Sequence, residues 1–135
     1  MIRITTKAIL CKLRLVLVGA WLGVAWLGGA GAVMAQDLTL FMLEQPGCIY
    51  CARWNAEVGD AYDKTAEGRA APLVRIQLRD PLPDGVTFAR KAVFTPTFVL
   101  VRDGQELERL EGYPGEDFFY GMLGVMLENA KSVPE

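Results

Sequence analysis

LTLFMLEQPGCIYCARW, residues 38–54, is the stretch of sequence that decides the fold. Residues 38–43 form a short, bounded apolar run, which predicts a buried strand. The four residues that follow include a Pro-Gly pair and predict a turn leading to Cys48. Apolar residues then recur at helical spacing as far as Tyr62. We therefore expect a helix that begins at the first cysteine.

The rest of the chain after this stretch adds strands and a closing helix. Residues 65–71 are polar and predict a helix end followed by a loop. We expect further strands at residues 73–78, 98–101 and 106–111, a short helix or turn at 86–93, and an amphipathic helix at 116–130. The resulting order, β-α-β followed by β-β-α, predicts an α/β fold in a single domain.

The first 35 residues have the pattern of a secretory signal peptide. Residues 1–14 carry four basic and no acidic residues. The following apolar run ends in Val33-Met34-Ala35, so small residues stand at positions −3 and −1 relative to a cut before Gln36. We expect cleavage there, which removes Cys11 and leaves residues 36–135 as an exported domain. An uncleaved membrane anchor is the alternative, because about 20 apolar residues can span a bilayer. Five glycines between residues 19 and 31 favour cleavage over anchoring.

The charge of the exported domain excludes some classes of partner. The chain has 14 basic and 16 acidic residues, and the signal segment contains four of the basic ones. The exported domain therefore has 10 basic and 16 acidic residues, a net charge of −6. An acidic domain without a basic cluster argues against nucleic acid or an anionic membrane surface as a partner. The chain contains no histidine. This absence excludes Ser-His and Cys-His hydrolase mechanisms.

The pair Cys48-Ile49-Tyr50-Cys51 suggests redox chemistry. Cysteines three residues apart at a helix start face the same side, and the first thiol lies where free backbone N–H groups favour the thiolate. We therefore expect Cys48 to be the nucleophile and Cys51 the resolving thiol. Zinc needs four ligands, and the domain supplies two cysteines and no histidine, so we expect neither metal nor cofactor. A structural disulfide remains open, although so short a loop gains little stability from closure.

Thr95-Pro96-Thr97 precedes the strand at 98–101 and has two interpretations. One is an ordinary proline that begins a strand, where no ladder hydrogen bond needs its missing N–H. The other is a cis-proline loop beside the cysteines, whose backbone groups pair with an extended substrate segment.

These landmarks resemble the thioredoxin superfamily, and the resemblance covers nearly all of residues 36–135. More narrowly, the chain is similar to periplasmic thioredoxin-like proteins of bacterial sulfur-oxidation (Sox) operons. The motifs that carry this similarity are EQPGCIYCARWN (44–55), KTAEGRAAPL (64–73), FTPTF (94–98) and EGYPG (111–115).

The resemblance implies a periplasmic reductant that acts on a protein disulfide or blocked cysteine, such as that of a sulfur-carrier protein. It implies a membrane thiol transporter as the electron donor, and we expect a monomer. It also implies that Pro96 is the cis-proline of the substrate-binding loop, with Thr95 beside it.

Three departures from this resemblance affect the chemistry. Ile49-Tyr50 replaces the Gly-Pro that typical thioredoxins have between their cysteines, and we expect Tyr50 to be exposed and able to contact substrate. Met42 stands where those proteins have a buried acid, so Glu44 is the candidate for proton transfer, with a solvated turn residue as the alternative. The extra strand and helix at the N-terminus of full thioredoxins are missing, which predicts a trimmed thioredoxin-like fold.

Two functional alternatives stay open. A glutaredoxin-like domain would exchange thiols with glutathione through one cysteine. Such a domain is expected to have a glycine-rich pair after the strand that follows the proline; this pair is absent, and Asp103-Gly104 is the nearest match. A non-catalytic module would bind a partner and keep the disulfide as a structural bond.

Overall fold

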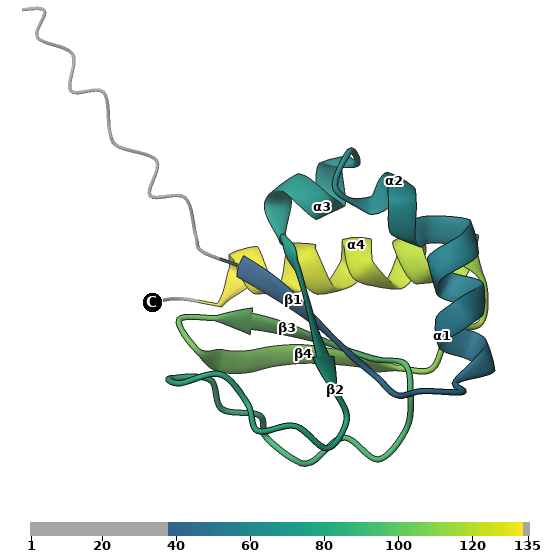
Figure 1. Cartoon of the computed structure of the whole chain (residues 1–135). Helices are drawn as coiled ribbons and strands as arrows, with labels where there is room; N and C mark the ends of the chain where they lie inside the picture. The colour runs from purple at the N-terminus through teal and green to yellow at the C-terminus, as the bar shows by residue number, and fades with distance from the viewer. Residues whose placement is uncertain (1–37, 134–135) are drawn as a thin grey trace, which may run out of the picture. The chain divides into compact units, whose positions relative to one another are not determined.

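The computed structural model describes residues 38–133, which build a four-stranded mixed sheet with helices (Figure 1). The strands are β1 (Leu38–Glu44), β2 (Leu73–Gln77), β3 (Thr97–Arg102) and β4 (Gln105–Glu111), in the spatial order β2-β1-β3-β4. β1 is parallel to β2 and antiparallel to β3, and β3 is antiparallel to β4. This arrangement confirms the predicted α/β, thioredoxin-like fold. The predicted signal segment, residues 1–35, lies outside the described residues.

The helical segments follow the predicted order with one addition. α1 (Ile49–Trp54) continues through a π-helical turn, η1 (Asn55–Gly59), into α2 (Asp60–Tyr62), and α4 (Glu116–Ser132) closes the domain. The addition is α3 (Ala66–Ala70), where the sequence predicted a helix end and loop. Thr65 caps it, because its hydroxyl accepts the backbone N–H of Gly68 at 3.0 Å. No helix within residues 38–133 is long and apolar enough to span a membrane.

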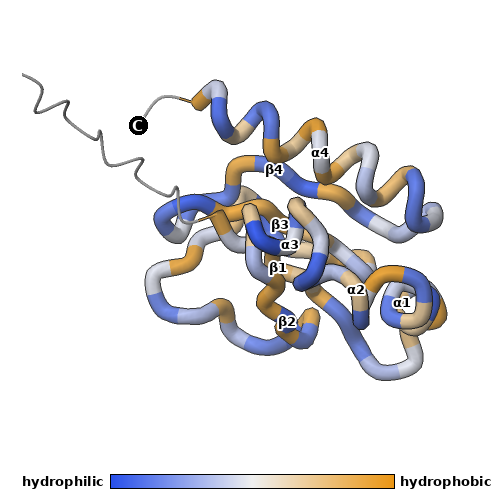
Figure 2. The backbone as a smooth tube through the Cα atoms, turned by 90° about the horizontal axis from the view of Figure 1, so that it is seen from above, coloured by the Kyte–Doolittle hydropathy of each residue, from blue (hydrophilic) through white to orange (hydrophobic). Residues whose placement is uncertain are grey.

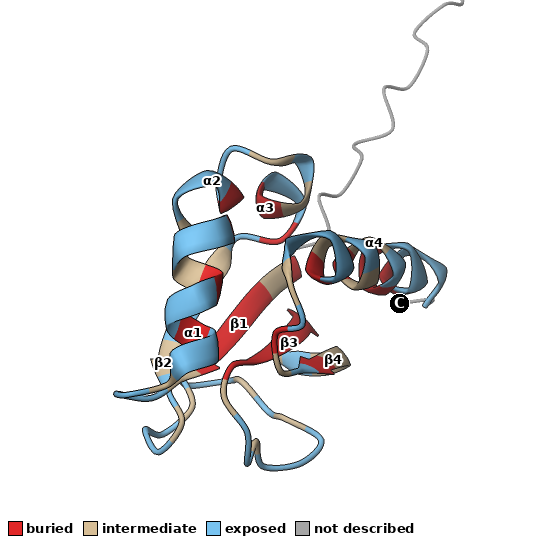
Figure 3. Ribbon diagram, turned by 90° about the vertical axis from the view of Figure 1, so that its right-hand side faces the viewer, coloured by how far each residue is buried: buried red, intermediate tan, exposed pale blue. Residues whose placement is uncertain are grey.

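The main core lies between the sheet and the helices. Alternate residues of β1 and β3 point to this side, and the inner faces of α1 and α4 are buried while their outer faces are exposed (Figure 3). Along α4, apolar and polar residues alternate at helical spacing (Figure 2). Trp54 and Phe119 are fully buried with their ring centroids 5.7 Å apart, edge to face. This contact joins α4 to α1, the helix that carries the cysteines.

The opposite face of the sheet is covered by the long segment between β2 and β3, residues 78–96, rather than by a helix. Residues 86–93, where we expected a short helix or a turn, form no helix: they have bends and irregular backbone, with one isolated bridge at Thr87. Thr87 forms a parallel bridge with Gln105, and the Ala89 N–H donates to Glu106 Oε2 at 2.8 Å. β4 therefore supplies hydrogen-bond partners that a helix would have provided internally.

Candidate functional site

The turn between β1 and α1 presents the cysteine pair at one end of the sheet. Gly47 has φ +77°, a conformation that favours glycine, and it lets the chain reverse directly before Cys48. Cys48 has extended backbone and is the N-cap of α1. The predicted helix start at the first cysteine is therefore confirmed.

Cys48 and Cys51 form a disulfide, with their Cα atoms 5.2 Å apart. The backbone N–H of Cys51 also donates to Cys48 Sγ at 3.0 Å, as a capping side chain would accept it. Cys51 is buried, at 4% exposure, whereas Cys48 is half-buried. The two cysteines are thus inequivalent, because Cys48 is partly exposed to solvent and Cys51 is buried in the core.

The segment before β3 lies at the same end of the sheet as the cysteine turn. The Thr95–Pro96 peptide bond is cis, and Thr97 pairs with Leu43 near the end of β1. Pro96 is buried and its carbonyl accepts the Gly112 N–H at 2.7 Å, while Thr95 is half-buried. The structure therefore has the cis-proline loop that was one of the two interpretations of this motif.

The Gly112–Gly115 segment joins this end of the sheet through Tyr113. The Tyr113 hydroxyl donates to Glu57 Oε2 at 2.6 Å, and Arg53 Nε donates to Glu57 Oε1 at 2.8 Å. The Arg53 guanidinium also lies over the Tyr113 ring, 5.6 Å from its centroid. The Tyr113 hydroxyl, together with Arg53, lowers the pKa of Glu57 below its ordinary value. This cluster ties the segment before α4 to the helix that carries the cysteines.

Only part of that cluster could be found in the sequence. Arg53 and Glu57 are spaced as a helical ion pair. Tyr113 lies 56 residues from Glu57, and no local pattern connects them.

Glu44 is half-buried at the end of β1 and is held by an ion pair. Arg75 donates to both of its carboxylate oxygens, at 3.0 and 2.7 Å, and also to Asn55 Oδ1 at 2.7 Å. The hydrogen bond to Glu44 raises the pKa of Arg75. Glu44 lines an open hollow of about 340 Å³ together with both cysteines. Glu44 is therefore an ordered acid beside the disulfide.

Met42, by contrast, is fully buried in the core cluster that includes Cys51 and Trp54. It offers no proton-transferring group to the cysteines.

Exposed apolar side chains flank the disulfide on two segments. Tyr50 is 52% and Ile49 73% exposed, and Val93 and Phe94, ahead of the cis-proline, are 66% and 61% exposed. The exposure expected for Tyr50 is confirmed. The exposure of Val93 and Phe94 was not predicted from the sequence, although two adjacent apolar residues in a loop were a usable signal. Exposed apolar groups beside a reactive pair are typical of a surface that binds other molecules.

Two further features concern ligands. No group of three or more His, Cys, Asp or Glu side chains that could hold a metal occurs among residues 38–133. Asp103-Gly104, the nearest match to a glutaredoxin-type pair, forms the tight turn between β3 and β4 with positive φ at both residues. That turn lies at the end of β3 opposite Pro96, and therefore at the other end of the sheet from the cysteines.

A family model described as a thioredoxin-like domain matches residues 32–126. Among solved structures, the periplasmic thioredoxin SoxS from Paracoccus pantotrophus, in its reduced form, is 58% identical. That match has a TM-score of 0.69 and covers 70% of this chain and 99% of the other. Thioredoxin (Mala s 13) from Malassezia sympodialis is 15% identical with a TM-score of 0.46, covering 68% and 76% of the two chains. No curated protein matches the chain.

Proposed function

The chain belongs to the thioredoxin-like family, and on that premise we propose that it is a periplasmic thiol–disulfide oxidoreductase that reduces a protein partner. The observation that carries the proposal is the Cys48–Cys51 disulfide at the start of a helix, with Cys48 half-buried and Cys51 buried. In the redox cycle this structure is the oxidised form, which an electron donor must reduce before the next turnover.

The reaction begins at Cys48. In the reduced domain its thiolate attacks one sulfur of the partner's disulfide or blocked cysteine, and the other sulfur leaves as a thiolate. The Cys51 N–H that faces Cys48 Sγ at 3.0 Å, together with the other free N–H groups of the first turn, stabilises the attacking anion. The product of this step is a mixed disulfide between Cys48 and the partner.

Cys51 completes the transfer. Its thiolate attacks the Cys48 sulfur, the Cys48–Cys51 disulfide forms, and the partner leaves with a free thiolate. Two electrons have then passed from the domain to the partner. Cys51 must lose its proton before it attacks, and Glu44, in the hollow that both cysteines line, is the acceptor we assign.

The surface around the cysteines holds the partner segment. The backbone groups of Thr95 pair with an extended segment that carries the reacting cysteine, and Pro96, whose own carbonyl accepts the Gly112 N–H, fixes the position of Thr95. Tyr50, exposed between the cysteines, packs against the same segment. These roles rest on the position of the cis-proline loop at the end of the sheet where α1 begins.

The location and the partner are inferred from the relative. The similarity to a periplasmic thioredoxin named SoxS supports residues 1–35 as a cleaved export signal and residues 36–135 as a domain of the periplasm. The name of that relative points to a partner in a Sox system. The finer proposals, a sulfur-carrier protein as the substrate and a membrane thiol transporter as the electron donor, rest on the sequence resemblance alone.

The cysteine roles can be tested by turnover. We expect the protein to reduce a protein disulfide with dithiothreitol as donor, and Cys48→Ser to lose this activity because the attacking thiolate is gone. Cys51→Ser should stop at the mixed disulfide, with the partner attached through Cys48. Mass spectrometry of Cys51→Ser recovered from host periplasm then identifies that partner.

Cys11→Ser in the full chain is the matched control, and it should retain full turnover because Cys11 lies in the export segment. Undiminished turnover by Cys48→Ser would contradict the assignment. Sustained glutathione-dependent turnover by Cys51→Ser would favour the one-cysteine mechanism instead.

A further inference from the structure

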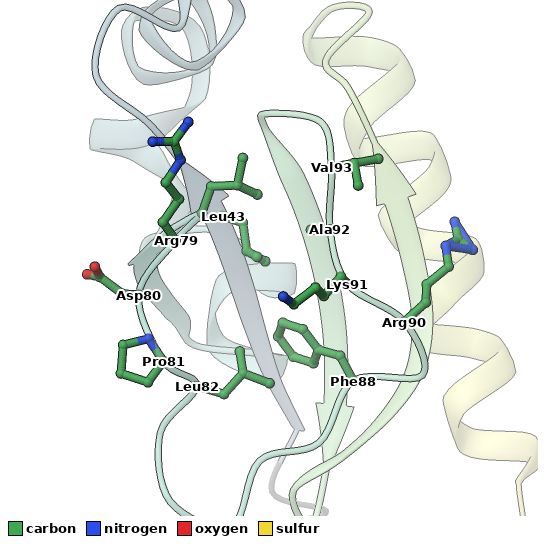
Figure 4. A pocket seen from close by; sticks show the side chains of 11 residues that line it. Leu43, Arg79, Asp80, Pro81, Leu82, Phe88, Arg90, Lys91, Ala92 and Val93 are labelled. Atoms are coloured by element: carbon green, nitrogen blue, oxygen red, sulfur yellow. The ribbon is translucent and has the colours of Figure 1, made fainter.

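A groove of about 620 Å³ lies on the face of the sheet away from the helices (Figure 4). Leu43 of β1 contributes to its floor, and the segment between β2 and β3 forms both walls. The apolar residues in its lining include Leu82, Phe88 and Ala92. This volume is in the range of pockets that bind a small molecule or a few side chains of a bound peptide.

The charged groups at this groove are mostly cationic. Arg79 rises from one wall, and the Lys91 ammonium reaches from the other wall into the space between them (Figure 4). Within residues 38–133 neither makes an ion pair. Arg90 points away and is paired with Glu111 at 2.8 Å, and the Asp80 carboxylate points outward from its loop. Two unneutralised cations thus border the groove of a domain whose net charge is −6.

The groove adjoins the cysteine site through neighbouring hollows that share lining residues. Leu78 and Arg79 also line a hollow of about 270 Å³ with Gln45. Gln45 in turn lines the hollow that contains Cys48. At the other side the groove reaches Val93, close in sequence to the cis-proline. A chain segment attached at Cys48 can therefore continue into the groove without leaving the surface.

We propose that this groove binds an acidic and apolar segment of the redox partner, next in sequence to its reacting cysteine. An apolar side chain packs on Leu43 and Phe88, and carboxylates face Arg79 and Lys91. The charge of the two cations selects an anionic segment, and the adjoining hollows that lead to Cys48 select a peptide that also bears the cysteine. This inference rests on the proposed function, since it describes how the same site chooses its substrate.

The test compares two synthetic peptides that differ only in charge. Each carries one cysteine blocked as a mixed disulfide, with leucines beside it and either glutamates or lysines further along. With dithiothreitol as donor, the wild-type protein should show the higher kcat/KM for the glutamate peptide. The double variant Arg79→Glu, Lys91→Glu should lower that value by about tenfold and reverse the order of the two peptides.

Lys64→Glu is the matched control. It reverses an exposed charge between α2 and α3, outside the residues that line the groove, and should leave the order of the peptides unchanged. Equal kcat/KM for the two peptides in the wild-type protein, or an equal effect of the double variant on both, would overturn the groove proposal. A dependence on Arg79 and Lys91 confined to glutathione disulfide would also overturn it, because the occupant would then be a small tripeptide. Absence of turnover with every disulfide would instead contradict the proposed function.

Discussion

At the scale of single residues, the acid near the cysteines has a different place from the one typical of thioredoxins. Met42 occupies the position six residues before Cys48 and is fully buried in the core. Glu44, two residues further along the same face of β1, reaches the hollow beside the disulfide instead. Arg75 holds it there with two hydrogen bonds, so the carboxylate is ordered where a proton must be removed.

Glu44→Gln tests this assignment because it keeps the size and removes the proton acceptor. We expect release of the partner from the mixed disulfide to slow by about tenfold or more, since general base catalysis contributes at least that much. Stopped-flow measurement of this step should also show a weaker dependence on pH. Glu67→Gln in α3 is the control and should leave the rate unchanged. A normal rate in Glu44→Gln would remove Glu44 from the mechanism.

At the scale of elements, three loops meet at one end of the sheet, and two of the contacts that hold them link one segment to another. The cysteine turn is set by Gly47, the cis-proline segment by the Gly112 hydrogen bond, and the segment before α4 by Tyr113 on Glu57. Elsewhere in the domain, the short helix α3 packs closely against the end of α2. Gly68 is the contact there, because a Cβ at this position would overlap the Tyr62 carbonyl.

Gly68→Ala should therefore destabilise the domain. We expect a loss of about 1–3 kcal/mol in the free energy of unfolding, because the obstructing atoms belong to the backbone and cannot rotate away. Gly121→Ala, at an open position in α4, should instead stabilise by about 0.5–1 kcal/mol through helix propensity. Urea unfolding of both variants measures the difference. Similar stability changes would contradict the close packing of α3 on α2.

At the scale of the whole molecule, the sequence predicted what depends on local patterns. The strands, the helix start at Cys48 and the closing helix follow from apolar periodicity and turn residues that lie next to one another. The Arg75–Glu44 pair and the Tyr113–Glu57 bond could not be predicted, because each joins residues far apart in the chain. The same holds for the groove, whose cations come from opposite walls of one long loop. Residues 86–93 form no helix, and hydrogen bonds from β4 hold Thr87 and Ala89 instead, which is a tertiary effect with no local signal.

The reduction potential of the Cys48–Cys51 pair tests the central claim most directly. Equilibration with thiol–disulfide buffers, followed by alkylation of free thiols, gives the fraction oxidised at each potential. If the domain is a redox-active reductant, the pair should titrate reversibly, at a potential well below the value of about −120 mV that is typical of a strong oxidant. A value near that of such an oxidant would contradict the reductant role. A pair that stays oxidised in millimolar dithiothreitol would contradict redox activity altogether.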